Sequence, residues 1–356
     1  MNREELRQYH VGENLDHIMN LDPRGYGVSR ILYKGSRAVN KSPLTISSAN
    51  ALDCVLQKGD LVYIITGFIL LPFHMPEMDG MVGSILLARA LIAAYDAKPV
   101  IICPEDNKKA VFQCANSVGL HVMEEIESLR RLPYSMGMIT FTKDREQAEE
   151  QADWMMKHMM PKAVISIEAP GANCFGEYHN AVGMNVTELE AKTDVLFEKL
   201  KESGVLNIAI GDLGNEIGMG AIADHIRKYI PYSGANQCQC ECQGGILAKS
   251  ATDHIITATV SDWGCYGMIA ALAFLKNDLS IMHTGEMERS VMEAAAKSGI
   301  IDMTGSLRPG IDGFDMEMNV AIVELMRQSV GFSIEYRKTQ NDWFEKVIEK
   351  EFYVAV

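Results

Sequence analysis

Short apolar runs alternate with longer segments of helical periodicity along most of the chain. The runs at 61–68, 99–103 and 163–167 are almost continuously apolar, which is typical of strands that are covered on both faces. Further strands are predicted at 120–123, 136–142, 206–211 and 254–260. Helices are predicted at 1–20, 46–57, 80–95, 107–118, 144–159, 187–203, 263–276, 286–298 and 314–329, with another after Gly220 and a strand and a helix at the C-terminal end.

This alternation predicts the fold class. A strand, a helix and a second strand in succession favour a right-handed parallel unit. The expected architecture is therefore α/β, with a mostly parallel, doubly wound (Rossmann-like) sheet that is flanked by helices and carries elaborations. No internal repeat, low-complexity segment or linker divides the chain, so we expect a single domain over residues 1–356.

Composition narrows the possible partners. The formal net charge of −14 argues against a nucleic-acid surface, which would need clustered Lys and Arg, and it fits a site that gathers carboxylates around a cation. The longest apolar run, at 61–71, is much shorter than the ~20 residues of a membrane helix, and the charged N-terminal segment is unlike a signal peptide. The 8 scattered cysteines indicate reduced thiols and a cytoplasmic protein. The Met-rich apolar helices leave surface for a homo-oligomer.

Two predicted strand ends carry carboxylates. Glu77 and Asp79 lie two residues apart just before the helix at 80–95, where an N-cap would account for Asp79 but not for both acids. Glu168 follows the strand at 163–167, where desolvation would raise its pKa unless a cation or hydrogen-bond donors lie beside it. We therefore expect Glu168 to be either a ligand or a catalytic base.

The loop after the strand at 206–211 is the first candidate for the active centre. Asp212, Asn215 and Glu216 stand there among several glycines, and open α/β sheets bind ligands beyond the carboxyl ends of their strands. A fourth polar loop precedes the helix at 263–276. In it Asp262 or Ser261 is predicted to cap that helix, and glycines permit a close backbone approach to a ligand.

Other signals are weaker. The glycine-rich loop lacks the G-x-G-x-x-G register of a dinucleotide site, and its acids would repel a pyrophosphate. The segment Cys238-x-Cys240-x-Cys242 could bind a soft metal, but its spacing is not the usual C-x₂-C, and a mobile loop is the favoured interpretation. His179 could belong to a site, but an ordinary loop histidine is the favoured interpretation. For Arg24, likewise, a surface arginine is favoured over a site residue.

Taken together, these loops resemble those of the D-glutamate cyclase family. The resemblance runs from about residue 24 to about residue 330, which we take as the core, with the terminal helices as additions. The matching motifs are Thr66-Gly67-Phe68, Glu77-x-Asp79-Gly80-x-x-Gly83, Ser166-Ile167-Glu168-x-Pro170-Gly171, Tyr178-x-Asn180-x-x-Gly183, Gly211-Asp212-x-Gly214-Asn215-Glu216-Ile217-Gly218-Met219-Gly220, Ser261-x-Trp263-Gly264-x-Tyr266-Gly267 and Asp312-Gly313. Leu213 stands where the family usually has Gly, Asp262 where Asn is common, and the Cys238 to Cys242 segment is peculiar to this chain.

The resemblance implies a lyase that converts D-glutamate to 5-oxo-D-proline and water. It also implies a divalent cation, Mg²⁺, Mn²⁺ or Ca²⁺, and a small acidic amino acid as the partner. From charge and hydropathy, we expect neither a nucleic acid nor a membrane as a partner. The cation ligands expected are Asp212, Glu216, Asp79 and Glu77. The catalytic residues expected are Glu168, as the base, with Asp212 and Glu216. The substrate contacts expected are Asn180, Asn215, Gly214, Gly218, Arg308 and Trp263.

Two alternatives remain at this point. A carboxylate-bound cation would equally serve a hydrolase of a small acidic or phosphorylated metabolite. A non-catalytic protein that binds a metal or a nucleotide is the other.

Overall fold

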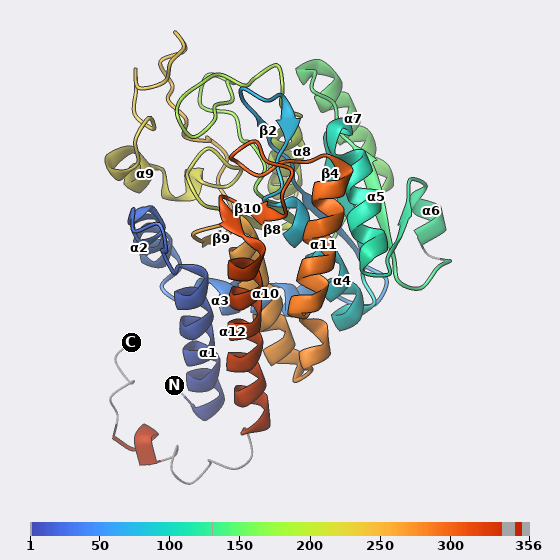
Figure 1. The fold of residues 1–356 in the computed structure, drawn as a ribbon, viewed down its shortest axis with the longest axis vertical. Coiled ribbons are helices and arrows are strands. Elements are labelled where there is room, and N and C mark those ends of the chain that lie inside the picture. Colours follow the sequence, from blue (N-terminus) through green and yellow to red (C-terminus); the bar gives the residue numbers. More distant parts are fainter. Residues whose placement is uncertain (1, 130, 337–345, 351–356) are drawn as a thin grey trace.

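A computed structural model describes residues 2–129, 131–336 and 346–350. Within these residues a seven-stranded sheet has the order β5-β6-β4-β1-β7-β8-β9, and every pair of neighbours is parallel (Figure 1). The strands are β1 (Leu61–Ile65), β4 (Lys98–Cys103), β5 (His121–Met123), β6 (Ser135–Thr140), β7 (Ala163–Ile167), β8 (Leu206–Gly211) and β9 (His254–Thr257). This confirms the predicted α/β class with a parallel, doubly wound sheet.

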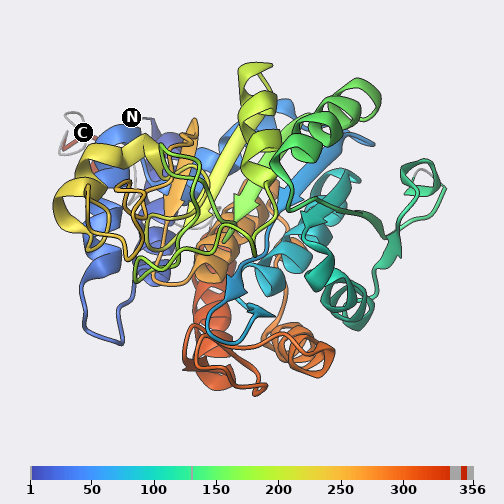
Figure 2. The same ribbon diagram turned by 90° about the horizontal axis from the view of Figure 1, so that it is seen from above.

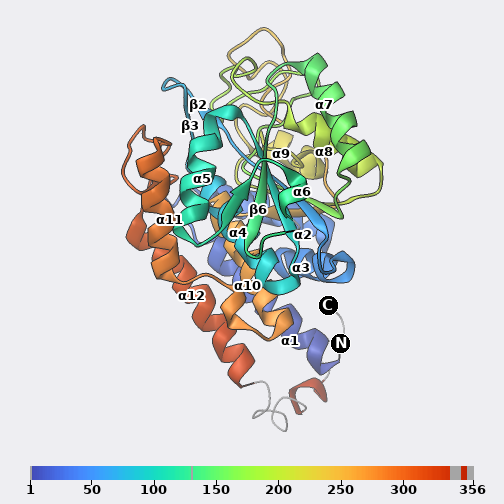
Figure 3. The same cartoon turned by 90° about the vertical axis from the view of Figure 1, so that its right-hand side faces the viewer.

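Helices cover both faces of the sheet, as Figures 2 and 3 show. On one face α7 (Arg145–His158) and α8 (Thr193–Glu202) pack on side chains such as Tyr63 and Val164. On the other face a larger group packs on Val62, Ile64 and Ile165. It comprises α1 (Arg3–Met19), α3 (Leu44–Val55), α4 (Met81–Tyr95), α5 (Lys108–Ser117), α10 (Ser261–Lys276), α11 (Gly285–Ser298) and α12 (Met316–Glu335). Burial on both faces explains why the strands are continuously apolar.

Smaller elements complete the fold at the ends of the sheet. They are the helices α2 (Val28–Asn40), α6 (Ile126–Leu129) and α9 (Ala223–Tyr229), the short helices η1 (Glu105–Asn107), η2 (Gly220–Ile222) and η3 (Leu279–Ile281), and the two-stranded pairs β2 (Ile69–Leu70) with β3 (Met75–Pro76) and β10 (Gly310–Ile311) with β11 (Phe314–Asp315). No helix in the described ranges is long and apolar enough to cross a membrane.

Two of the longer helices differ from the predictions, and one further prediction is largely untested. α2 was not predicted; it starts at a left-handed Gly27 without a side-chain cap, and its apolar residues pack around Ile226 of α9. The helix predicted at 187–203 begins only at Thr193. Its first residues stay in a loop because the Thr187 hydroxyl accepts the Tyr178 N–H and the Glu190 carboxylate accepts the Ile69 N–H. The strand and helix predicted at the C-terminal end fall mostly outside the described residues.

Candidate functional site

A cavity of about 370 Å³ lies at the carboxyl ends of β1, β7, β8 and β9. The strand order reverses between β1 and β7, the position where open α/β sheets bind ligands. The volume is near the small end of ligand pockets. The lining residues are Asp22, Arg24, Tyr26, Val28, Ser29, Phe68, Ile69, Leu70, Glu77, Glu168, Asn180, Ala181, Val182, Asp212, Leu213, Asn215, Ala258, Thr259, Met303 and Asp312.

Glu168 occupies the first residue after β7 with a left-handed backbone, φ +42°. A residue other than glycine is strained there and keeps this conformation only where its surroundings hold it. Its N–H donates to Ile210 of β8, and its carbonyl accepts the N–H of Gly67 after β1. Its carboxylate accepts the Ser261 hydroxyl at 2.6 Å. The three neighbouring strand ends thus fix the Glu168 side chain against the cavity.

The loop after β8 is folded around Glu216. The Glu216 carboxylate accepts the backbone N–H groups of Asp212 at 2.8 Å, Leu213 at 2.7 Å and Gly214 at 2.6 Å. Glu216 itself is fully buried and does not line the cavity, whereas Asp212 and Leu213 do. The contacts of Glu216 therefore shape the loop that presents Asp212.

Asp79 and Asp262 cap each other's helices. The Asp79 carboxylate accepts the N–H groups of Ser261 and Asp262 at the start of α10, besides that of Gly80. One Asp262 oxygen accepts the N–H groups of Gly80 and Gly83 at the start of α4. The prediction that Asp262 caps the helix after it is wrong, because Asp262 caps α4 instead of α10. Asp79 contacts Gly80 before its own helix but mainly caps α10.

Arg24 and Asp312 lie at the site although the sequence did not predict a role there for either residue. Arg24 donates to the Asp312 carboxylate at 2.9 Å, and its guanidinium lies 4.6 Å from the centre of the Phe314 ring. Both Arg24 and Asp312 line the cavity. The Asp312-Gly313 turn was visible as a motif, and Arg24 as an arginine in a glycine-rich turn. Their pairing, across 288 positions of sequence, has no local signal.

The acids raise one another's pKa. Burial first and Asp312 second raise the pKa of Asp79 to about 8 and that of Glu77 well above its usual range. Burial, then Asp312 and Glu168, does the same to the pKa of Asp212. For Glu168 the causes are burial, then Glu216 and Asp79. Among the described lining residues, Arg24 is the only one with a basic side chain, whereas several are acidic. The cavity therefore carries an excess of negative charge.

Two groups of carboxylate oxygens lie close enough to share an ion. Asp79, Asp212 and Asp312 form one group, and Glu168, Asp212 and Glu216 form the other; within each group the oxygens lie within 4.8 Å of one another. Asp212 belongs to both. No hydrogen-bond donor in the described part of the chain contacts the carboxylate of Asp212 or of Glu77. Lining atoms of other kinds are also without a partner there, namely the Ser29 and Thr259 hydroxyls and the Asn215 Oδ1.

The predicted substrate contacts are only partly brought together. Asn180 and Asn215 line the cavity. Trp263 is buried in the core, where its Nε1 donates to Asn319 at 2.7 Å, and Arg308 is exposed beside Ser306. Neither side chain is among the lining residues.

Gly214 and Gly218 use their N–H groups within the protein. The first donates to Glu216 and the second to the Ser250 hydroxyl. These two N–H groups are therefore already bonded within the protein, although the sequence suggested both glycines as substrate contacts.

Comparison with known proteins points to one family. The family described as "D-glutamate cyclase-like, C-terminal" matches residues 15–327. The human protein "D-glutamate cyclase, mitochondrial" is 27% identical over 269 residues, which are 73% of this chain and 38% of the human protein. The chain thus matches well under half the length of that relative.

Proposed function

We propose that this chain, which belongs to the D-glutamate cyclase-like family, converts D-glutamate to 5-oxo-D-proline and water with the help of a divalent cation. The observation that carries the proposal is the acid-rich cavity with a single arginine at the switch point of the sheet. An amino acid with two carboxylates and one ammonium group complements such a lining, because it needs both a cationic contact and anionic ones.

The residues fit a hard cation. Asp79, Asp212 and Asp312 offer only oxygen atoms, which Mg²⁺ and Mn²⁺ prefer. The raised pKa values of Asp79 and Asp212 reflect buried negative charge that a cation would neutralise. Asp212 and Asp312 would hold the ion, with Asp79 beside them. When bound, it would supply a Lewis acid for the γ-carboxylate of the substrate.

Arg24 and Asn215 orient the substrate in this proposal. The Arg24 guanidinium is the partner for the α-carboxylate, since guanidinium and carboxylate pair in a planar fork. The Asn215 Oδ1, which has no donor among the described residues, accepts from the α-ammonium group. This arrangement brings the nitrogen toward the γ-carbon.

Glu168 moves the protons. Lactam formation makes one N–C bond and breaks one C–O bond, and two protons pass from the nitrogen to the oxygen that leaves as water. Burial and the neighbouring Glu216 raise the pKa of Glu168, which makes its carboxylate a stronger base. The carboxylate accepts a proton from the nitrogen and the resulting carboxyl donates it to the leaving oxygen, once for each of the two protons. The Ser261 hydroxyl, bonded to the same carboxylate, keeps it in place.

The test is to incubate the protein with D- or L-glutamate and Mg²⁺ or Mn²⁺ and to measure 5-oxoproline by chiral chromatography. We expect product from the D enantiomer, and at least a 100-fold loss of turnover in Glu168→Gln and in Asp212→Asn, within the range typical of a lost proton-transfer group. The exposed Asp224→Asn variant is the matched control. Absence of 5-oxoproline from both enantiomers with both ions would overturn the proposal.

A further inference from the structure

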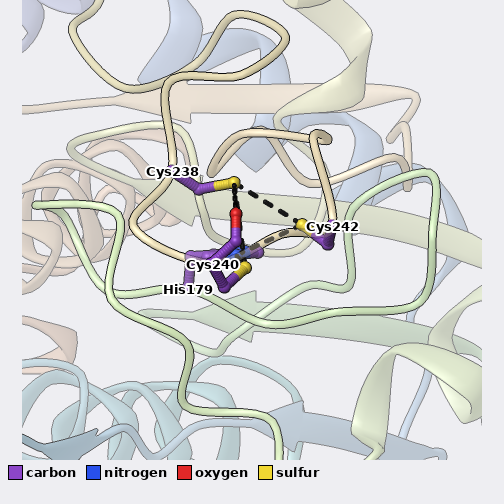
Figure 4. A group of neighbouring side chains, drawn as sticks. All are labelled: His179, Cys238, Cys240 and Cys242. Carbon is purple, nitrogen blue, oxygen red and sulfur yellow. Dashed lines mark hydrogen bonds between the residues drawn. The ribbon is translucent and has the colours of Figure 1, made fainter.

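Three cysteines and a histidine converge beside the cavity. After α9 the chain turns back over the loop that follows β7, and bends at 238–240 with a turn at 241–242 bring alternate side chains to one side. Cys238, Cys240 and Cys242 there face His179 of the underlying loop, as Figure 4 shows. The spacing is not the usual C-x₂-C of zinc sites, but these bends let all three sulfurs face one histidine.

The donor atoms form a compact group. His179 Nε2 lies 3.1 Å from Cys240 Sγ and 3.6 Å from Cys242 Sγ. Cys238 Sγ lies 3.6 Å from Cys242 Sγ and 3.8 Å from Cys240 Sγ. All eight cysteines of the chain are free thiols in the structure. The four donors therefore surround one point.

These separations match the edges of a zinc tetrahedron. With Zn–S near 2.3 Å and Zn–N near 2.05 Å, tetrahedral geometry requires about 3.8 Å between sulfurs and about 3.5 Å between sulfur and nitrogen. The sulfur–sulfur distances of 3.6 and 3.8 Å and the nitrogen–sulfur distance of 3.6 Å meet this requirement. Of these four distances, the one between His179 and Cys240, at 3.1 Å, departs most from the requirement. So small a group has room for a single ion.

N–H groups from the surrounding protein point at two of the three cysteine sulfurs. The Asn173 side-chain amide and the Gly244 N–H both lie 3.4 Å from Cys242 Sγ, and the Asn185 amide lies 3.8 Å from Cys240 Sγ. N–H groups directed at metal-bound sulfur are the outer contacts that orient and tune such ligands. His179 is almost fully buried, and its Nε2 faces the sulfurs of Cys240 and Cys242.

We propose that His179, Cys238, Cys240 and Cys242 bind one Zn²⁺ ion in a closed, structural Cys₃His site. A set of four protein ligands leaves no open position for a substrate, which is the mark of a structural rather than a catalytic zinc. This site is separate in chemistry from the oxygen-lined cavity, and its existence does not depend on the function proposed for that cavity.

The site ties a surface loop to the wall of the cavity. His179 precedes the lining residue Asn180, and its carbonyl accepts the Asn215 amide at 3.0 Å. Between the cysteines, Gln239 donates from its backbone to Gly183 at 2.7 Å and from its side chain to Val182 at 2.9 Å. Zinc binding thus holds in register the segment that supplies Asn180 and Val182 to the cavity.

The experiment measures metal without substrate. Protein is purified under reducing conditions without chelator, and its zinc content is determined by mass spectrometry. The apoprotein is then titrated with Co²⁺. We expect about one zinc per chain and, with Co²⁺, the near-ultraviolet thiolate charge-transfer band and the visible bands of a tetrahedral ion. Cobalt bound only by the carboxylates of the cavity would lack the thiolate band, which keeps the two cation sites distinct.

Variants locate the ion. Cys240→Ser and His179→Gln are expected to lose the zinc equivalent and the thiolate band, whereas Cys174→Ser, an exposed cysteine of the same loop region, keeps both. Circular dichroism shows whether each variant is folded. A reduced wild-type protein with neither zinc nor the cobalt spectrum would overturn the proposal, and so would equal loss in Cys174→Ser. A Cys238–Cys242 disulfide with no metal uptake after reduction would also count against it.

Discussion

Glu216 provides a test that separates the role suggested by sequence from the role indicated by its contacts. The sequence predicts a cation ligand, but the carboxylate accepts three backbone N–H groups of its own loop. The bonds from Asp212 and Gly214 are buried and the bond from Leu213 is partly buried. Removal of the carboxylate would therefore leave loop donors without an acceptor.

The expected magnitude follows from these bonds. A buried donor left unpaired costs about 1–3 kcal/mol. With two such donors, Glu216→Ala is expected to lower the free energy of unfolding by about 2–6 kcal/mol. Glu216→Gln keeps one oxygen and loses the acceptor at one position, so its loss is about 1–3 kcal/mol. Glu150→Ala, on an exposed helix position, is the control and should stay within about 0.5 kcal/mol of wild type.

The assay is urea unfolding followed by tryptophan fluorescence, with all four proteins measured together. If the free energy of unfolding increases from Glu216→Ala to Glu216→Gln to wild type, Glu216 acts as an anchor for the loop. Wild-type stability in Glu216→Ala would refute the reasoning. Wild-type stability in Glu216→Gln combined with lost Mg²⁺ affinity would instead identify Glu216 as the ligand that the sequence suggested.

Two further predictions concern charge. Burial first, then Asp79 and Glu288, raises the pKa of Asp262 well above its ordinary 3.8, so this group makes the fold less stable as pH rises from the unfolded pKa through the folded one. Asp262→Asn keeps the oxygen that caps α4. Its melting temperature is expected to lie above that of wild type at pH 8–9, and the difference is expected to vanish near pH 4. Scanning fluorimetry across pH checks this, and a difference that is constant with pH would contradict it. Arg24→Gln is expected to raise KM for D-glutamate about 10-fold or more, with a smaller change in kcat. A change of about 10-fold corresponds to the low end of the free energy of a hydrogen bond to a charged group. Steady-state kinetics checks this, and an unchanged KM would exclude the α-carboxylate contact.

The parallel sheet was predictable from sequence, and so was the convergence of several acids at one of its edges, for a common reason. Continuous apolar runs identify strands covered on both faces, and parallel strands place their carboxyl ends at one edge. Glu77, Glu168 and Asp212 follow three different strands and do line one cavity. Here local pattern and global fold agree, so residue order along the chain was enough.

The individual roles were not predictable, because they depend on contacts between distant segments. Arg24 and Asp312 meet from nearly opposite ends of the chain, and His179 meets cysteines about 60 residues away. Trp263 has the motif position of a site residue, yet its indole is held in the core by Asn319. Residue type and spacing describe what a side chain can bind, whereas only the packing decides what it contacts.

The crossed caps show how this acid-rich region can remain buried. A sequence pattern assigns a capping acid to the helix that follows it, but α4 and α10 start side by side, and each is capped by the acid at the other's start. Both helix N-termini, with their partial positive charge, therefore face the acids. They offset the charge of Asp79 and Asp262 through backbone N–H groups. The carboxylates of Asp212 and Glu77 receive no such donor among the described residues. A bound cation or a substrate ammonium group would therefore interact most favourably with these two carboxylates.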